Sequence, residues 1–321
     1  NLPIDAAGLQ RIVCWASHFA PARNLRGAER TTDKCTGAAT ADEAYAKLIA
    51  PLREHIHNNR LILVPHNVLH YVPFAALHDA GSNRYLIEDY TLSYIPSASA
   101  LRFLRSKETP VKGVALILGN PSSALPAARH IRGAEEEAVA VAGHLGSKAV
   151  LGPQARESLL YGLGGDVDLV HIASHAIYDP VNPLFSRIAL APGDGYDGNL
   201  EVHEILSSLD LSGVNLVVLS ACETAVGERS GGDEIVGLTR ALLYAGTPGV
   251  ISTLWRIDDT SSALLMDEFY RRFAAGALAA DALRDSQLAV LRSEHYADPK
   301  YWAAFTLSGN PQGRWTAAPA H

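Results

Sequence analysis

The chain has 321 residues, a formal net charge of −7, 48% hydrophobic residues and 19% charged residues. These values are typical of a soluble globular protein with a substantial core, long enough for two domains or one large one. They do not fit a strongly basic nucleic-acid-binding protein, and no run of 18 apolar residues predicts a membrane span.

The start of the chain and its cysteines indicate where such a protein would work. The sequence begins at Asn1 without a methionine or a secretory pattern, which suggests a piece of a longer protein. Its cysteines, Cys14, Cys35 and Cys222, are odd in number and widely spaced, so we expect no disulfide framework. No C-x-x-C motif predicts structural zinc. We therefore expect a cytoplasmic protein with reduced thiols.

Before residue 106 the spacing of apolar residues predicts helices and a few strands. Pro51 is expected to kink or break the second helix, and Ser97 is expected to cap the third. The segment 66–79 reads as a loop or a short helix. We expect helices at residues 1–20, 41–59 and 97–104, and strands at 61–64 and, as a pair, within 85–95.

A polar segment at 106–112, which contains Pro110, marks the expected boundary between two domains, 1–110 and 111–321. Beyond it strands and helices alternate, as in βαβ units. Asp259 is expected to cap its helix, and the last strand is expected at the edge of the sheet. The predicted strands are 114–118, 148–151, 168–174, 187–190, 216–219, 249–255 and 305–307, and the predicted helices are 130–145, 156–163, 202–209, 235–245, 259–273 and 279–292.

Two of these strands lead into reactive side chains. The run L-V-V-L at 216–219 continues through Ser220 and Ala221 to Cys222, and the run D-L-V-H-I-A-S at 168–174 leads to His175. Short apolar runs of this kind are typical of strands buried on both faces. The offset of 47 residues leaves room for one crossover between parallel strands. We therefore expect both side chains at the carboxyl edge of one sheet, where α/β proteins bind ligands.

Several stretches of the chain resemble the CHAT domain family, caspase-like domains of clan CD that are similar to separase and often attached to TPR repeats. They are L-V-P-H-N-V-L-H-Y-V-P-F-A-A-L, Y-L-I-E-D-Y-T-L-S-Y-I-P-S, H-I-A-S-H-A, V-V-L-S-A-C-E-T, and G-D-E-I-V-G-L-T-R-A-L-L-Y-A-G through S-T-L-W-R-I-D-D. The resemblance covers about residues 61–310. It implies an α/β fold of the caspase-hemoglobinase type, a three-layer αβα sandwich with a mostly parallel central sheet. It also implies that an inactive protease-like N-terminal half precedes the catalytic domain.

The same resemblance implies a cysteine endopeptidase with His175 and Cys222 as its dyad. A free thiol has a pKa of about 8.5, so a nucleophilic Cys222 needs a neighbouring imidazole to take its proton. His175 would then act as general base and general acid. The backbone N–H groups of Ala176 and Cys222 would stabilise the oxyanion, although Ala176 stands where caspases and separases carry glycine. The alternative is that Cys222 is a small core residue.

Other polar residues near these strands have less certain roles. His171, four residues before His175, reads as a core or supporting histidine rather than a metal ligand. Asp168 is too far from His175 to complete a triad, and Asp179 lies beyond a turn, so we expect a dyad alone. We expect no metal and no cofactor.

Caspase-like enzymes generally select a charged residue before the cleaved bond, and acidic side chains would form a pocket for Arg or Lys. Candidates follow two strands whose ends are expected to face the cleft. The alternative is that they cap helices, because Asp and Glu favour first turns. The four candidates are Asp233, Glu234, Asp258 and Asp259.

The sequence therefore predicts a cysteine endopeptidase that cuts a partner protein and is regulated by an attached or partner sensor, such as a TPR-containing region. One alternative is a protease-derived scaffold that binds partners without cutting them. Another is a small-molecule hydrolase or transferase with a Cys/His pair, which a deep closed pocket would favour over an open groove.

Overall fold

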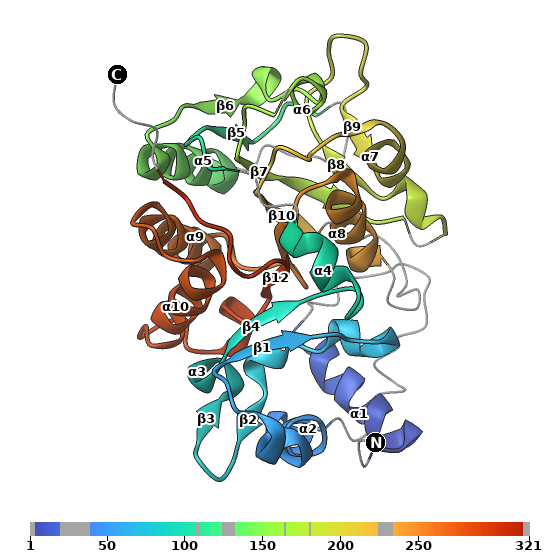
Figure 1. The fold of residues 1–321 in the computed structure, drawn as a ribbon, viewed down its shortest axis with the longest axis vertical. Helices are drawn as coiled ribbons and strands as arrows, with labels where there is room; N and C mark the ends of the chain where they lie inside the picture. Colours follow the sequence, from blue (N-terminus) through green and yellow to red (C-terminus); the bar gives the residue numbers. More distant parts are fainter. Residues whose placement is uncertain are drawn as a thin grey trace.

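The computed structural model describes residues 4–19, 39–106, 110–123, 132–163, 165–179, 181–223 and 234–316. The strands of its main sheet are β1 (Arg60–Leu63), β4 (Thr91–Tyr94), β5 (Ala115–Gly119), β6 (Ala149–Leu151), β7 (Leu169–Ile177), β8 (Arg187–Ala189), β9 (Asn199–Glu201), β10 (Leu216–Glu223), β11 (Gly249–Thr253) and β12 (Phe305–Gly309). Their order is β1-β4-β12-β11-β10-β7-β5-β6, with β8 and β9 continuing from β7 (Figure 1).

Most neighbouring strands of this sheet are parallel. β11, β10, β7, β5 and β6 share one direction. β12 runs antiparallel to β11 and parallel to β4, which is itself parallel to β1. The sheet therefore consists of a five-stranded parallel block that contains β7 and β10, extended on one side by three strands of the opposite direction.

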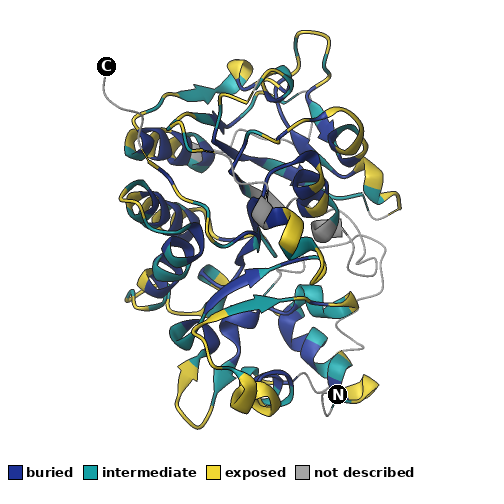
Figure 2. Ribbon diagram, in the orientation of Figure 1, coloured by how far each residue is buried: buried dark blue, intermediate teal, exposed yellow. Residues whose placement is uncertain are grey.

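Helices cover both faces of the sheet. α5 (Arg132–Leu145), α9 (Asp259–Ala274) and α10 (Ala279–Leu291) pack on one face. α4 (Ala100–Ser106), α6 (Ser158–Tyr161), α7 (Val202–Ser208) and α8 (Glu234–Ala245) pack on the other (Figure 1). Buried residues concentrate on the strands and on the helix sides that face them (Figure 2). The expected three-layer αβα arrangement with a mostly parallel sheet is confirmed.

The apolar run of β10 explains why this strand lies inside the sheet. Leu216 and Val218 belong to the core beneath α5, α9 and α10, whereas Val217 and Leu219 belong to the core beneath α7 and α8. All four side chains are at most 4% exposed. Successive residues of a strand point to opposite faces, so a strand covered on both sides needs apolar residues at every position.

The N-terminal segment contains α1 (Ala6–Ser17), α2 (Ala41–Leu48) and a 3₁₀ helix at Ala50–His55. Pro51 lies at the start of this 3₁₀ helix, so the expected break in the second helix is confirmed.

The paired strands expected within 85–95 are wrong in part. β3 (Arg84–Tyr85) pairs with β2 (His78–Asp79), and the short helix α3 (Leu86–Asp89) separates it from β4. The carboxylate of Glu88 accepts a hydrogen bond from the backbone N–H of Tyr85 at 2.8 Å, which favours a helical turn at this point.

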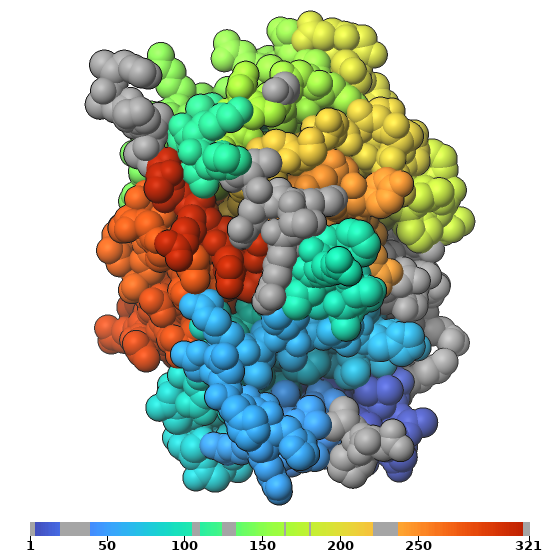
Figure 3. All heavy atoms as spheres, viewed as in Figure 1, coloured from blue at the N-terminus to red at the C-terminus, as the bar shows by residue number. Residues whose placement is uncertain are grey.

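Segments on both sides of residue 110 share one core and one sheet. Residues of α1, α2 and α3 join those of α9, α10 and β12 in a single apolar cluster. The space-filling view shows the N-terminal residues, blue to cyan, packed directly against the orange and red C-terminal residues (Figure 3). A division into a 1–110 half and a 111–321 half stays a prediction.

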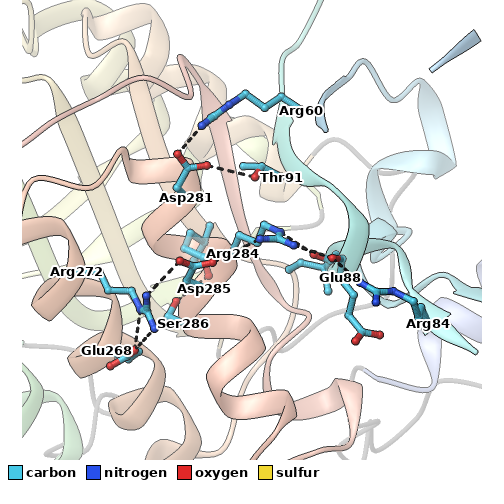
Figure 4. Close-up of polar contacts among 12 residues, drawn as sticks. Arg60, Arg84, Glu88, Thr91, Glu268, Arg272, Asp281, Arg284, Asp285 and Ser286 are labelled. Atoms are coloured by element: carbon cyan, nitrogen blue, oxygen red, sulfur yellow. Dashed lines mark hydrogen bonds and ion pairs between the residues drawn. The ribbon is translucent and has the colours of Figure 1, made fainter. Parts of the chain in front are cut away.

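Polar contacts from α10 reinforce this junction (Figure 4). Arg284 donates hydrogen bonds to the backbone carbonyls of Ile87 and Glu88 at 2.9 and 2.7 Å. Asp281 accepts a hydrogen bond from the hydroxyl of Thr91 at 3.2 Å and pairs with the guanidinium of Arg60. One face of α10 therefore binds both α3 and the β1–β4 pair.

The position expected for the last strand is wrong. β12 is not an edge strand, because it lies between β11 and β4. Phe305, Thr306 and Leu307 are at most 7% exposed. The edge prediction failed because β12 pairs with a strand more than 200 residues earlier, through the register Ser308 to Tyr94.

Two further features concern the class of protein. Cys14 is disulfide-bonded, which overturns the expectation that the thiols are all reduced; the side chain of its partner is not among those described.

In the described part of the chain, no helix is long and apolar enough to cross a membrane.

Candidate active site

The strands that lead to His175 and Cys222 are hydrogen-bonded neighbours. β7 and β10 run parallel in a register that pairs Leu216 with Leu169 and, six positions on, Cys222 with His175. Adjacent strands are about 4.8 Å apart, so the two backbones present these residues side by side. The sequence placed both at strand ends, but β7 continues to Ile177 and β10 to Glu223.

The structure describes the side chain of His175 but not that of Cys222. His175 is half-buried, and the next residue, Ala176, is only 3% exposed. Ala176 lies between two strands, in register with Glu223 of β10 and Ile188 of β8. The side chain of Cys222 lies outside the described part of the structure. The structure therefore shows the pairing of the two positions, whereas a hydrogen bond between their side chains stays a prediction.

His171 is a core histidine, as predicted. Its side chain is fully buried, with Nδ1 2.9 Å from the hydroxyl of Tyr270 on α9. Its Nε2 lies 3.2 Å from a carboxylate oxygen of Glu137 on α5, which is itself 8% exposed. Burial, and then the charge of Glu137, raises the pKa of the Tyr270 hydroxyl well above its ordinary value. This polar cluster ties β7 to both helices that cover its face.

The two aspartates considered for a triad have structural roles. One carboxylate oxygen of Asp168 accepts hydrogen bonds from the backbone N–H groups of Lys112 and Val114, each at 2.9 Å. Asp179 accepts two from the N–H groups of Val181 and Asn182, also at 2.9 Å, which holds the pKa of its carboxyl below the usual range. Asp168 therefore anchors the start of β7, and Asp179 shapes the turn after it.

The structure describes only some of the four acidic side chains that were predicted to form a substrate pocket. Asp233 lies outside the described residues, and Glu234 is the first residue of α8, with a side chain outside them. Asp258 caps α9, because its carboxylate accepts hydrogen bonds from the N–H groups of Thr260 and Ser261 at 3.1 Å. The sequence had assigned this cap to Asp259, which is instead the exposed first residue of the helix. A pocket built by the four acids stays a prediction.

Further polar residues lie on the β8–β9 hairpin next to His175 and on the segment before α6 that contacts it. Glu157 is 1% exposed, and its carboxylate accepts a hydrogen bond from the N–H of Gly198 at 2.9 Å. Arg187 and Asn199 occupy β8 and β9. No motif assigns these residues to the site. Arg187 and Asn199 are polar side chains in short strands next to the His175 strand, and Glu157 directly precedes α6. Among the described residues, no group of three His, Cys, Asp or Glu side chains is placed to hold a metal ion.

The family model of the CHAT domain matches residues 38–310. The chain belongs to the CHAT domain family. Tetratricopeptide repeat protein 28 of Mus musculus is 29% identical over 320 residues, and that of Homo sapiens is 29% identical over 321. Each alignment covers 83% of this chain but only 13% of the relative, so the chain spans a small part of these curated proteins.

Solved structures of similar fold are proteases of the caspase-like type. The separase–securin complex of Saccharomyces cerevisiae aligns with a TM-score of 0.52 and 16% identity, over 97% of this CHAT domain chain and 23% of that chain. The complex of the Porphyromonas gingivalis RgpB pro- and mature domains aligns with a TM-score of 0.51 and 12% identity, over 98% and 78%. At these identities the likeness concerns the fold, and it confirms the caspase-like fold predicted for this chain.

Proposed function

We propose that this CHAT domain is a cysteine endopeptidase in which Cys222 is the nucleophile and His175 the general base and acid. The observation that carries the proposal is the register of β7 and β10, which pairs these two residues at the carboxyl ends of parallel strands. A caspase-like fold supports it, because the chain aligns over almost its whole length with proteases of that fold.

The reaction follows from the chemistry of the pair. The imidazole of His175 takes the thiol proton, and the thiolate attacks the carbonyl carbon of the cleaved peptide bond. The C–N bond then breaks, and His175 gives its proton to the leaving amine. Water, deprotonated by His175, releases the acyl group from the sulfur. The backbone N–H groups of Ala176 and Cys222 are the proposed hydrogen-bond donors to the oxyanion. Each such donor increases the rate by a factor of about 10²–10³.

The buried cluster of His171, Glu137 and Tyr270 supports this function by holding β7 in place. These side chains connect β7 to α5 and α9 four residues before His175. Productive geometry at a nucleophile and its base requires a rigid support, because a small displacement lowers the rate strongly. We therefore propose a dyad, rather than a triad, on a strand that is held in place by α5 and α9.

The proposed substrate is a protein, cut under the control of an attached or partner sensor. The curated relatives are named for tetratricopeptide repeats, and the separase neighbour was solved with securin. Both names point to protein partners of this fold. By analogy, a repeat-containing region or a partner would control the access of substrate to Cys222.

The test is cleavage of a random-sequence decapeptide library, followed by mass spectrometry. Wild-type protein is expected to cut, and Cys222→Ala and His175→Ala are expected to lose cleavage at least 10²-fold (an order of magnitude taken from general acid–base catalysis). His295→Ala removes an exposed histidine and serves as the matched control, which should cut like the wild type. Cleavage that persists in both dyad variants rejects the proposal.

A second candidate is a scaffold that binds partners without cutting them. The observation that favours it is the name of the curated relatives, which refers to repeats and not to proteolysis. A scaffold would bind library peptides yet leave them intact, and its Cys222→Ala variant would bind them equally well.

A further inference from the structure

The hairpin after His175 extends the sheet into a row of neighbouring residues. β8 pairs antiparallel with the end of β7 through Ala176 to Ile188, which places His175 opposite Ala189. Ala189 in turn pairs with Asn199 of β9. Together with the register of Cys222 and His175, one row therefore crosses four strands from Cys222 to Asn199.

One face of this extension is core, and the other is partly open. Ile188 and Leu200 are fully buried in the cluster beneath α7 and α8. The alternate residues point to the opposite face, where most of them are half-buried. We call this face the His175 shelf, and it comprises His175, Ile177, Arg187, Ala189, Asn199 and Glu201.

Two polar atoms of the shelf are buried without a partner. Within the described part of the chain, Nε of Arg187 and Oδ1 of Asn199 have no hydrogen-bond partner. The carboxylate paired in register with Arg187, that of Glu201, lies 2.7 Å from Nε2 of His203 instead. Leaving a buried donor or acceptor unpaired is costly, so such atoms in a folded protein point to a ligand or to water.

A peptide main chain has the complementary groups. Each of its amide units offers one N–H donor and one C=O acceptor, which match the acceptor of Asn199 and the donor of Arg187. Asn199 is two strands away from His175, roughly 10 Å, which an extended peptide covers in about three residues. Ala189, between them, presents only a methyl group.

The position of the shelf relative to Cys222 determines which part of a peptide substrate it can contact. In the proposed reaction the acyl part stays on Cys222, while the leaving amine receives its proton from His175. The leaving chain must therefore start on the His175 side of Cys222, where the shelf begins.

We propose that the His175 shelf binds the main chain of the leaving peptide, two or three residues after the cleaved bond. Asn199 accepts a hydrogen bond from a peptide N–H, and Nε of Arg187 donates one to a peptide C=O. The inference rests on the proposed peptidase function, whose substrate side it completes. It predicts recognition of backbone rather than of particular side chains on that side of the cut.

The first arm of the test measures binding without catalysis. Immobilised Cys222→Ala protein is loaded with a random-sequence decapeptide library, and retention is compared with that of the same protein carrying Arg187→Met or Asn199→Leu. Asn199→Leu removes an oxygen that has no described partner, and Arg187→Met gives up one long hydrogen bond, from Nη1 to the backbone carbonyl of Phe185 at 3.5 Å, so both variants are expected to fold. Loss of one hydrogen bond should lower retention about fivefold to tenfold. Arg271→Met, an exposed ion-paired arginine on α9, is the matched control and should retain peptides fully.

The second arm uses cleavage. Two substrates share one acyl part, taken from the peptides that the wild type cuts; one carries an aminocoumarin and the other a tetrapeptide as leaving group. The ratio of kcat/KM for the tetrapeptide to that for the aminocoumarin should fall about fivefold in each shelf variant. A wild type that cuts no library peptide supplies no acyl part for these substrates and rejects the peptidase, and the binding arm then decides on the shelf. Library retention equal in parent and shelf variants, or absent in all, overturns the shelf.

Discussion

The buried carboxyl of Glu157 should make the stability of this domain depend on pH. Burial, which is the largest cause, and then the nearby charges of Glu204 and Asp197 raise the pKa of this carboxyl to about 6, although the N–H of Gly198 works in the opposite direction. The side chain anchors Gly198, which adopts a φ of +86° directly before Asn199 and β9. The perturbation that tests this role is Glu157→Gln, which keeps an acceptor for Gly198 and removes the charge.

The expected magnitude follows from the difference in pKa between the folded and unfolded states. An ordinary glutamate has the value 4.5, so the folded protein holds its proton more tightly than the unfolded chain. A raised carboxyl pKa means that folding disfavours the charged form of Glu157. The protonated carboxyl therefore contributes its full stability below the pKa of the unfolded state, and this contribution is lost as the pH rises through the pKa of the folded state. A difference of about 1.5 pKa units corresponds to about 2 kcal/mol.

Urea unfolding followed by tryptophan fluorescence measures this directly. Between about pH 4 and about pH 7.5 the wild type should lose about 2 kcal/mol more of its free energy of unfolding than Glu157→Gln. Glu54→Gln, at an exposed glutamate, should follow the wild type at every pH. A difference between wild type and Glu157→Gln that stays constant across this range would refute the reasoning.

Three further substitutions test other parts of the structure. Tyr270→Phe removes the buried hydroxyl bound to His171 and should lower the free energy of unfolding by about 1–3 kcal/mol in urea titrations, and an unchanged midpoint would contradict the polar cluster. Asp258→Ala should lower the free energy of unfolding by about 1 kcal/mol, and by more than Asp259→Ala, because only Asp258 caps α9; equal effects would argue against that cap. Arg284→Met should cost about 1–3 kcal/mol and increase hydrogen exchange in α3, whose carbonyls it binds, whereas unaltered exchange there would show that α10 does not hold this junction.

The strands of the candidate site could be predicted because their sequences are decisive locally. A strand covered on both faces needs a continuous apolar run, which Leu216 to Leu219 supplies. The helix stripe of α8 and the break at Pro51 are local signals of the same kind.

Features that depend on distant partners were beyond the sequence. The interior position of β12 depends on the pairing of Ser308 with Tyr94, which no nearby residue encodes. The cap of α9 differed by one residue, because Asp258 and Asp259 are chemically equal and only the backbone decides which lies outside the helix. The row from His175 to Asn199 likewise exists only once β8 folds back onto β7.

The central claim, that Cys222 and His175 act as one chemical unit, is tested most directly by alkylation. The rate at which iodoacetamide labels the peptide that contains Cys222 is measured by mass spectrometry across a range of pH in wild type and in His175→Ala. A sulfur beside an imidazole should titrate with a pKa below about 8.5 in the wild type, and removal of the ring should return the pKa to that ordinary value. Identical titration curves in the two proteins would contradict the account.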